Sequence, residues 1–212
     1  WSNYIGPLSV EHWINDGLMA IFFLLIGLEL KRELYNGELS NFKNALLPIF
    51  AALGGLAFPA LIHFFLNAGT PTQAGIGIPM ATDIAFALGA LAILGNRVPA
   101  SLKVFVVAFA VLDDLCAIVI IAVFYTAELS ALYLVGALLV LATLAAAARF
   151  LGIKSLVVYL LVGALAWYLM LKSGVHATIA GVLLAFAIPS SELEDDEESP
   201  SYQLEHLLHM PV

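Results

Sequence analysis

Long apolar segments separated by short polar loops run through the whole of this 212-residue chain. A helix rises about 1.5 Å per residue, so about 20 apolar residues cross the hydrocarbon core of a bilayer. Several segments are shorter than this, but the loops between them are shorter still, as in a compact bundle. The pattern predicts an all-α polytopic membrane protein with about seven transmembrane helices, near residues 13–30, 45–67, 76–95, 104–126, 130–148, 155–171 and 175–189.

Polar stretches divide the chain coarsely. Residues 1–190 are predicted to form the transmembrane helix bundle. An acidic loop is predicted over residues 191–203, and residues 204–212 are predicted to begin a further element that is cut off. The chain starts at Trp1 without a methionine and stops at Val212, so we expect a part of a longer protein.

Composition agrees with a membrane protein. Hydrophobic residues make up 62% of the chain and charged residues only 11%, with a mean hydropathy of +1.01. So few charges cannot cover a soluble domain of this size. The formal net charge of −8 falls to −2 without one acidic run, which consists of Glu192, Glu194, Asp195, Asp196, Glu197 and Glu198. No basic patch suggests nucleic acid as a partner.

The basic residues predict an orientation. Seven of the eight lie in alternate loops and therefore on one face of the membrane: Lys31, Arg32, Lys43, Arg97, Lys103, Arg149 and Lys154. Only Lys172 falls opposite. Because cytosolic loops carry an excess of lysine and arginine, we expect that face to be cytosolic. The start of the chain is then extracytoplasmic and the acidic tail cytosolic.

The most unusual segment is the run Val104 to Tyr125, VFVVAFAVLDDLCAIVIIAVFY, whose only charges are Asp113 and Asp114 at its middle. Placing one ionised aspartate near the bilayer midplane costs about 2.5–3.5 kcal/mol on insertion scales. Two adjacent aspartates cost more, because like charges repel strongly once water is removed. A segment that served only as an anchor would not carry this penalty. The pair therefore predicts an ion or proton site.

A second unusual segment reads IGIPMATDIAFALGALAILG, in which Gly75, Gly77 and Pro79 come just before Thr82 and Asp83. Proline removes a backbone donor, and glycine lowers the cost of unwinding a helix. We therefore predict an interrupted helix near Pro79–Asp83, where freed carbonyl groups could coordinate a cation, as in secondary transporters. The alternative is a kinked helix in which Asp83 bonds to a neighbouring backbone group.

The segments ATDIAFALGALAILGNRVP and LDDLCAIVIIAVFYT resemble motifs of sodium/proton antiporters of the NhaA type. So do WINDGLMAIFFLLIGLELKRE, LKSGVHATIAG and LEHLLH, in the same order and with compatible spacing. Antiporters of this type are examples of inverted repeats with ion sites near the midplane. The resemblance implies part of an inverted-repeat antiporter fold. Compared with the family layout, the chain lacks the first transmembrane helix and everything after the eighth, including a second broken helix.

The resemblance also implies site residues. The ion and proton site falls on Asp113 and Asp114, which would bind sodium transiently, with Asp83 and Thr82 at the crossing of the interrupted helices. Asp114 would exchange proton for cation, and Asp113 would pair with a lysine that this chain lacks. Asp16 resembles an acid on the outer route to the site, or else marks a polar helix start.

The implied activity is exchange of sodium or lithium for protons across a bacterial inner membrane, contributing to pH and sodium homeostasis. Sodium prefers oxygen ligands, and one carboxylate site cannot hold proton and cation together. If it opens alternately to the two faces, one gradient drives the other. The resemblance implies no enzymatic activity and no cofactor. It implies the lipid bilayer as a partner and allows a homodimer.

A pH-responsive cytosolic cluster is also implied by the resemblance, at Glu29, Arg32, Glu33, Glu205 and His206. Histidine titrates near neutral pH, which makes a switch reasonable. The alternative is a solvated helix end with an ordinary ion pair. Tyr202 and Gln203 stand where some family members carry a basic residue. We expect His176, in GVHATIAG, to be a packing residue that forms hydrogen bonds and not a proton relay.

Three other functions were weighed. Intramembrane aspartyl proteases also place aspartates on neighbouring membrane helices, but their Gly-x-Gly-Asp pattern precedes none of Asp83, Asp113 and Asp114. A passive cation channel would carry current without proton flux. A non-transporting fragment is the third alternative.

Overall fold

The computed structural model describes residues 4–5, 8–35, 37–80, 84–124, 129–153, 155–189 and 199–209. The chain forms two compact units, and each is described by itself. The first unit comprises Trp1–Arg32 with Ile121–Val212, and the second comprises Glu33–Ile120.

The first unit begins with a short hairpin that leads into a long helical run. Strands β1 (Tyr4–Ile5) and β2 (Leu8–Ser9) pair antiparallel. The hydroxyl of Ser9 accepts a hydrogen bond from the backbone N–H of His12 at 3.3 Å and so caps the helix that follows. The other elements that contribute to this unit are α1 (Val10–His12), the π-helix η1 (Trp13–Leu18), α2 (Met19–Tyr35), α6 (Ala131–Leu151), α7 (Leu156–Ser173), α8 (Ile179–Ala187) and α9 (Pro200–His209).

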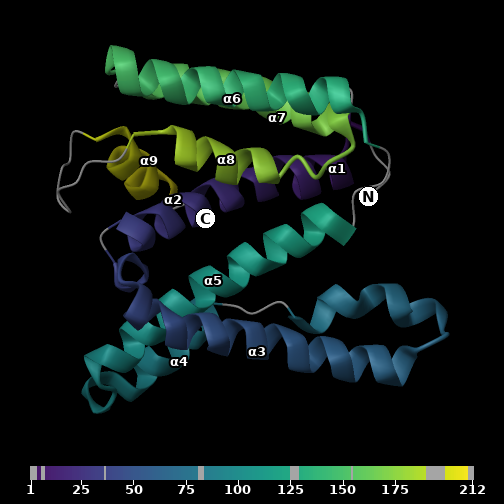
Figure 1. The fold of residues 1–212 in the computed structure, drawn as a ribbon, viewed down its shortest axis with the longest axis vertical. Helices are drawn as coiled ribbons and strands as arrows, with labels where there is room; N and C mark the ends of the chain where they lie inside the picture. The colour runs from purple at the N-terminus through teal and green to yellow at the C-terminus, as the bar shows by residue number, and fades with distance from the viewer. Residues whose placement is uncertain are drawn as a thin grey trace. The chain divides into compact units, whose positions relative to one another are not determined.

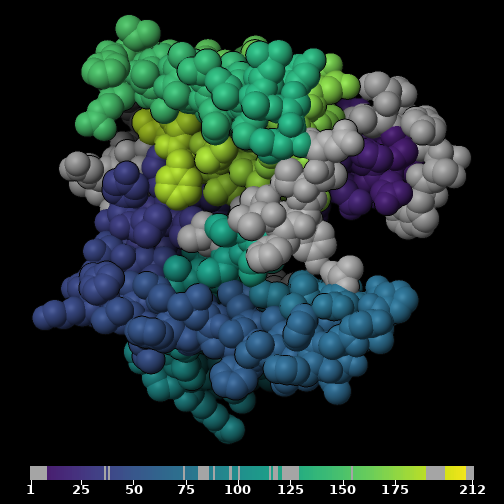
Figure 2. All heavy atoms as spheres, turned by 45° about the vertical axis from the view of Figure 1, so that its right-hand side comes forward, coloured from purple at the N-terminus to yellow at the C-terminus, as the bar shows by residue number. Residues whose placement is uncertain are grey.

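Helices α6 and α7 form a hairpin and lie side by side (Figure 1). Gly152 ends α6 with a φ of 60°, a left-handed conformation that glycine adopts without strain. The hydroxyl of Tyr159 donates to the carbonyl of Ile153 at 2.6 Å and closes the turn. Helix α8 lies against both helices, and Figure 2 shows its yellow-green atoms directly beneath the green atoms of the hairpin. A buried apolar core joins these helices to α2 and α9, and includes Leu28, Leu141, Leu144, Tyr159, Ala166, Leu184 and Leu204.

Helices α2 and α8 approach unusually closely because small residues face one another. A Cβ atom added to Gly181 would lie 2.2 Å from the carbonyl oxygen of Ala20. One added to Gly27 would lie 2.7 Å from the Cβ of Ala185. Small residues allow this approach between membrane helices, where packing replaces the hydrophobic effect as the driving force.

The second unit is built mainly from three α-helices and a 3₁₀ segment. Helices α3 and α5 meet at Gly55, where an added Cβ would lie 3.4 Å from the ring of Phe109. Its buried apolar side chains include Ala52, Leu56, Ala108 and Val111. The elements that contribute to it are η2 (Glu38–Ser40), α3 (Phe42–Asn67), η3 (Pro71–Met80), α4 (Ile84–Leu94), η4 (Gly95–Arg97) and α5 (Ala100–Phe124).

Within the described residues, four helical runs are long and apolar enough to cross a bilayer: Val10–Tyr35, Phe42–Asn67, Ala131–Leu151 and Leu156–Ser173. These runs carry many exposed large apolar side chains, such as Phe65 and Phe150. Such surfaces suit lipid and not water. The prediction of an all-α polytopic membrane protein is confirmed.

Three boundaries differ from the sequence prediction. The segment predicted at 76–95 is a 3₁₀ helix up to Met80 and an α-helix from Ile84. The segment predicted at 175–189 contains only the nine residues of α8, because Ile188 is extended and precedes Pro189, whose ring disfavours helical geometry before it. Helix α9 begins at Pro200, within the acidic loop predicted over 191–203, because proline fits the first turn of a helix.

Candidate functional site

The aspartate pair lies in the middle of α5, a helix of 25 residues. Asp113 is 1% exposed, whereas Asp114 is half-buried. Successive residues point about 100° apart around a helix, so one carboxylate can be enclosed while its neighbour stays more accessible. The described part of the second unit thus contains a fully buried acid beside a less buried one. The roles assigned to the two aspartates stay predictions.

Thr82 and Asp83, the other two predicted ion-site residues, lie outside the described residues. The chain on either side is described. Before them, η3 has 3₁₀ geometry and an irregular backbone at Gly75, with φ −78° and ψ 17°. After them, α4 begins at Ile84. The described residues before the predicted interruption are thus in a 3₁₀ helix and those after it in an α-helix, and the interruption itself stays a prediction.

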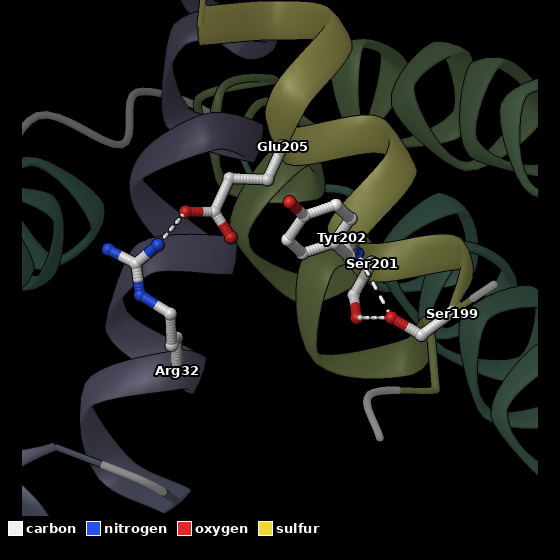
Figure 3. Close-up of polar contacts among 5 residues, drawn as sticks. All are labelled: Arg32, Ser199, Ser201, Tyr202 and Glu205. Atoms are coloured by element: carbon white, nitrogen blue, oxygen red, sulfur yellow. Dashed lines mark hydrogen bonds and ion pairs between the residues drawn. The ribbon is translucent and has the colours of Figure 1, made fainter. Parts of the chain in front are cut away.

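Two of the residues predicted to respond to pH form an ion pair. The Arg32 guanidinium on α2 donates through Nη1 to Oε1 of Glu205 on α9 (Figure 3). The Arg32 side chain is 52% exposed and that of Glu205 only 13%. The hydroxyl of Ser199 accepts the backbone N–H of Tyr202 at 3.3 Å, which caps the first turn of α9. The cap and the buried Leu204 set the direction in which Glu205 points.

The other members of the predicted cluster are placed differently. His206 is exposed, with its ring 6.3 Å from that of Tyr202. Glu29 lies one turn before Glu33 on α2 and is half-buried. Glu33 belongs to the second unit, where its carboxylate lies against the backbone of Gly37. The structure therefore brings together Arg32 and Glu205, while Glu33 packs against the nearby Gly37.

One ionic residue was missed by sequence reasoning. Lys31 was counted among the loop charges, but it lies within α2 and is only 6% exposed. Its ammonium donates to the backbone carbonyls of Ala185, Phe186 and Ile188 at the end of α8. A partial signal was available in the sequence, because α8 has no cationic side chain in its last turn to interact with its own carbonyls.

Asp16 lies in the π-helical turn η1, at the far end of the same run. The indole N–H of Trp167 donates to the backbone carbonyl of Asp16 at 2.6 Å, and the Trp167 ring stacks on Trp13 at 6.3 Å. The half-buried Asp16 carboxylate interacts electrostatically with His12 and His176. Asp16 therefore lies near titratable groups, and the polar helix start stays open as the alternative. Its place on an outer route stays a prediction.

A pocket of about 500 Å³ opens between α2, α7 and α8. Its lining includes Trp13, Gly17, Trp167 and Gly181 and contains no ionisable side chain, so its chemistry does not suit an ion. Within the described ranges, no three His, Cys, Asp or Glu side chains gather as they would for a resident metal ion. The apolar pocket is therefore not our candidate for ion exchange, and the aspartate pair of α5 is.

Comparison with known proteins agrees with these features. The family model described as Na+/H+ antiporter 1 matches residues 2–212. A protein of Dechloromonas aromatica named Na(+)/H(+) antiporter NhaA is 68% identical over 212 residues, which are 100% of this chain and 54% of the relative. Proteins of the same name from Cytophaga hutchinsonii and Helicobacter pylori are 58% and 60% identical, over 100% and 88% of this chain and 54% and 42% of each relative.

The chain spans about half the length of the curated relatives it matches. The match nevertheless runs through both units described above, including the aspartates of α5 and the ion pair between α2 and α9. This chain belongs to the Na+/H+ antiporter 1 family.

Proposed function

We propose that the protein exchanges sodium ions for protons across a membrane, and that Asp113 and Asp114 bind either ion in turn. One observation carries the proposal: in a chain of this family, a carboxylate that is 1% exposed lies directly beside a half-buried one at the middle of α5. The sodium ion here is the substrate. The name of the relatives, Na(+)/H(+) antiporter, supports the same exchange.

The chemistry follows from burial and charge. An apolar environment disfavours the ionised form of a carboxylate, and an adjacent carboxylate disfavours it further. Either a proton or a small hard cation can remove the excess charge, but not both together. Asp114, the more accessible of the two, is the proposed exchanging group. Thr82 and Asp83 would add oxygen ligands, and lithium would use the same ligands as sodium.

The proposed location is the inner membrane of a bacterium. Seven of the eight basic residues lie in or next to alternate predicted loops, although Lys31 is buried within α2. This bias supports a cytosolic end for α2 and a cytosolic position for the acidic tail. Asp16 then lies on the extracytoplasmic side, on the proposed outer route. The β1–β2 hairpin lies on that side as well.

The ion pair between Arg32 and Glu205 is proposed to take part in a cytosolic pH response, together with Glu29, Glu33 and His206. The pair is partly solvated, so its net contribution to stability is small, about 0–1 kcal/mol. A contact of this strength can be broken by protonation of one partner. In this proposal its opening changes the rate of exchange and thereby contributes to pH and sodium homeostasis.

The test uses the protein reconstituted in proteoliposomes with a pH-sensitive dye inside. Asp114→Asn keeps the shape of the side chain and removes its charge, so we expect sodium addition to move no protons. The control is Glu11→Gln, which removes an exposed acid of α1 and should leave exchange unchanged. Robust exchange by Asp114→Asn would contradict the assignment.

The same vesicles separate exchange from the alternatives. A sodium current without proton movement would indicate a channel. Cleavage of a model transmembrane substrate that is lost in Asp113→Ala would indicate a protease. Absence of all three activities in the unsubstituted protein would indicate a non-transporting one.

A further inference from the structure

Lys31 is a cation enclosed by one helix end. Its ammonium lies 3.5 Å from the carbonyl oxygen of Ala185 and 3.3 Å from that of Phe186, and it also donates to Ile188. A lysine ammonium has three N–H donors and no acceptor. The three carbonyls therefore use its whole donor capacity. With 6% exposure the side chain is held by these contacts and not by water.

Helix α8 needs such a partner. The last carbonyl groups of any helix lack an intrahelical donor, and the helix dipole makes that end negative. The backbone N–H of Ile188 returns to Leu184, but Pro189 next in the chain has no N–H to donate. The sequence of α8, IAGVLLAFA, contains no ionisable side chain of its own. Lys31 supplies from α2 the cap that α8 does not carry.

The residue next to Lys31 makes a second contact between helices. Arg32, the next residue of α2, binds Glu205 on α9 (Figure 3). Adjacent residues point about 100° apart, so one turn of α2 can reach two different helices. Lys31 holds the end of α8, and Arg32 holds α9, the next helix described along the chain. Both contacts originate from a single point on α2.

We propose that Lys31 is a positioning residue for the Arg32–Glu205 ion pair. By fixing the end of α8 on α2, it fixes where the chain departs toward α9 and so the position at which Glu205 meets Arg32. This inference rests on the proposed pH response of that pair. It assigns Lys31 no contact with sodium or with the exchanged proton.

Other titratable groups at this place must be considered in any pH experiment. Helix α8 contributes none. Besides Lys31, the ionisable residues whose side chains are described on the two helices that meet there are Glu29, Arg32, Glu33 and Tyr35 on α2 and Tyr202, Glu205 and His206 on α9. Because several groups can move a pH midpoint, a single substitution at Lys31 would not identify which of them it acts through. A double-mutant cycle does.

The first experiment measures the pH midpoint of sodium/proton exchange in proteoliposomes for four proteins: unsubstituted, Lys31→Met, Glu205→Gln and the double variant. Each single variant should shift the midpoint in the same direction, by about 0.5 unit or more, which corresponds to about 0.7 kcal/mol. The double variant should shift no further than Glu205→Gln alone, with the maximum rate kept. Additive shifts, or an unmoved midpoint in Lys31→Met, would overturn the proposal.

A second measurement needs no transport, so its failure is distinct from a failure of the proposed function. A spin label at Leu207, an exposed position of α9, reports the mobility of that helix in a Cys116→Ser background. Mobility should rise in Lys31→Met and stay unchanged in Lys31→Arg, which keeps the cation. If Lys31→Met does not fold, Lys31→Gln replaces it in both experiments. An unchanged label in the neutral variant would overturn the positioning role.

Discussion

Two helices of this protein each carry a pair of adjacent, like-charged residues: Asp113–Asp114 on α5 and Lys31–Arg32 on α2. In both pairs the first residue is buried, at 1% and 6% exposure, and the second is more accessible. The basic pair has fixed protein partners, namely three backbone carbonyls and the carboxylate of Glu205. For the acidic pair, our proposal is that a mobile cation or a proton binds in turn.

The difference teaches how burial alone should be interpreted. A buried charge whose every donor meets a carbonyl oxygen stabilises a particular arrangement of helices. A buried acid next to a half-buried one is different, because each disfavours ionisation of the other. On this basis the acidic pair is proposed to govern exchange and the basic pair to govern the assembly of the first unit. Substitutions on the two helices should therefore have opposite consequences for transport and for stability.

The largest expected effect is on transport. Asp113→Asn removes one of the two charges with almost no change in shape, so exchange should fall to background while the protein stays folded. Asparagine has nearly the shape of aspartate, so we expect the protein to keep its fold and a similar melting temperature. Dye-monitored exchange and thermal unfolding on one preparation check both statements. Unfolding of Asp113→Asn at a much lower temperature would make the acidic pair structural, like the basic one.

The next effect is on stability. Lys31→Met keeps the apolar stem but leaves the carbonyls of α8 without their donor, which should cost about 1–3 kcal/mol in the free energy of unfolding. Lys172→Met is the matched control, because that lysine is exposed and lies 5.7 Å from the Tyr168 ring. It should lose less than about 1 kcal/mol. If the two variants lost the same free energy of unfolding, the carbonyl contacts of Lys31 would contribute no more than the surface contact of Lys172.

A third prediction tests whether the basic pair depends on the close contact of α2 and α8. Gly181→Ala would place a Cβ atom 2.2 Å from the carbonyl of Ala20, so we expect a loss of about 1–3 kcal/mol. Gly54→Ala on α3 is the control, since nothing lies within 4 Å of its added Cβ. It should be neutral or slightly stabilising. Calorimetry of the two variants decides, and a stable Gly181→Ala would mean that the helices separate at little cost.

The sequence was informative where a residue conflicts with its surroundings. Two acids inside an apolar run are costly in a membrane, so hydropathy alone identifies Asp113 and Asp114 as candidate site residues. The all-α membrane class followed from the apolar segments, and the family followed from motifs. Lys31 was misplaced because a lysine near the end of an apolar segment is most often a loop or interfacial residue. Only the close approach of α8, 154 residues further on, shows that it is buried.

Some details of the helices could not be predicted from the sequence. Hydropathy alone treats residues 76–95 as one apolar segment, and only the glycine and proline residues near Pro79 predicted an interruption within it. Backbone geometry separates η3 from α4 at that place. The partner of Arg32 was predicted only as one member of a cluster. The cap at Ser199 and the burial of Leu204 decide that Glu205 is the residue that meets it.

The smallest expected effect concerns Asp83, the third acid assigned to the exchange site. If its carboxylate acts on the broken-helix backbone and not as the main ligand, Asp83→Asn should weaken apparent sodium affinity by about tenfold, or 1.4 kcal/mol, with the maximum rate kept. The measurement is exchange rate against sodium concentration, beside Asp114→Asn, which should show no rate at any concentration. Unchanged affinity with a lower melting temperature would instead support a kinked helix in which Asp83 bonds to the backbone. The acidic site would then consist of Asp113 and Asp114 without Asp83. It would have the same number of charged residues as the basic pair of Lys31 and Arg32.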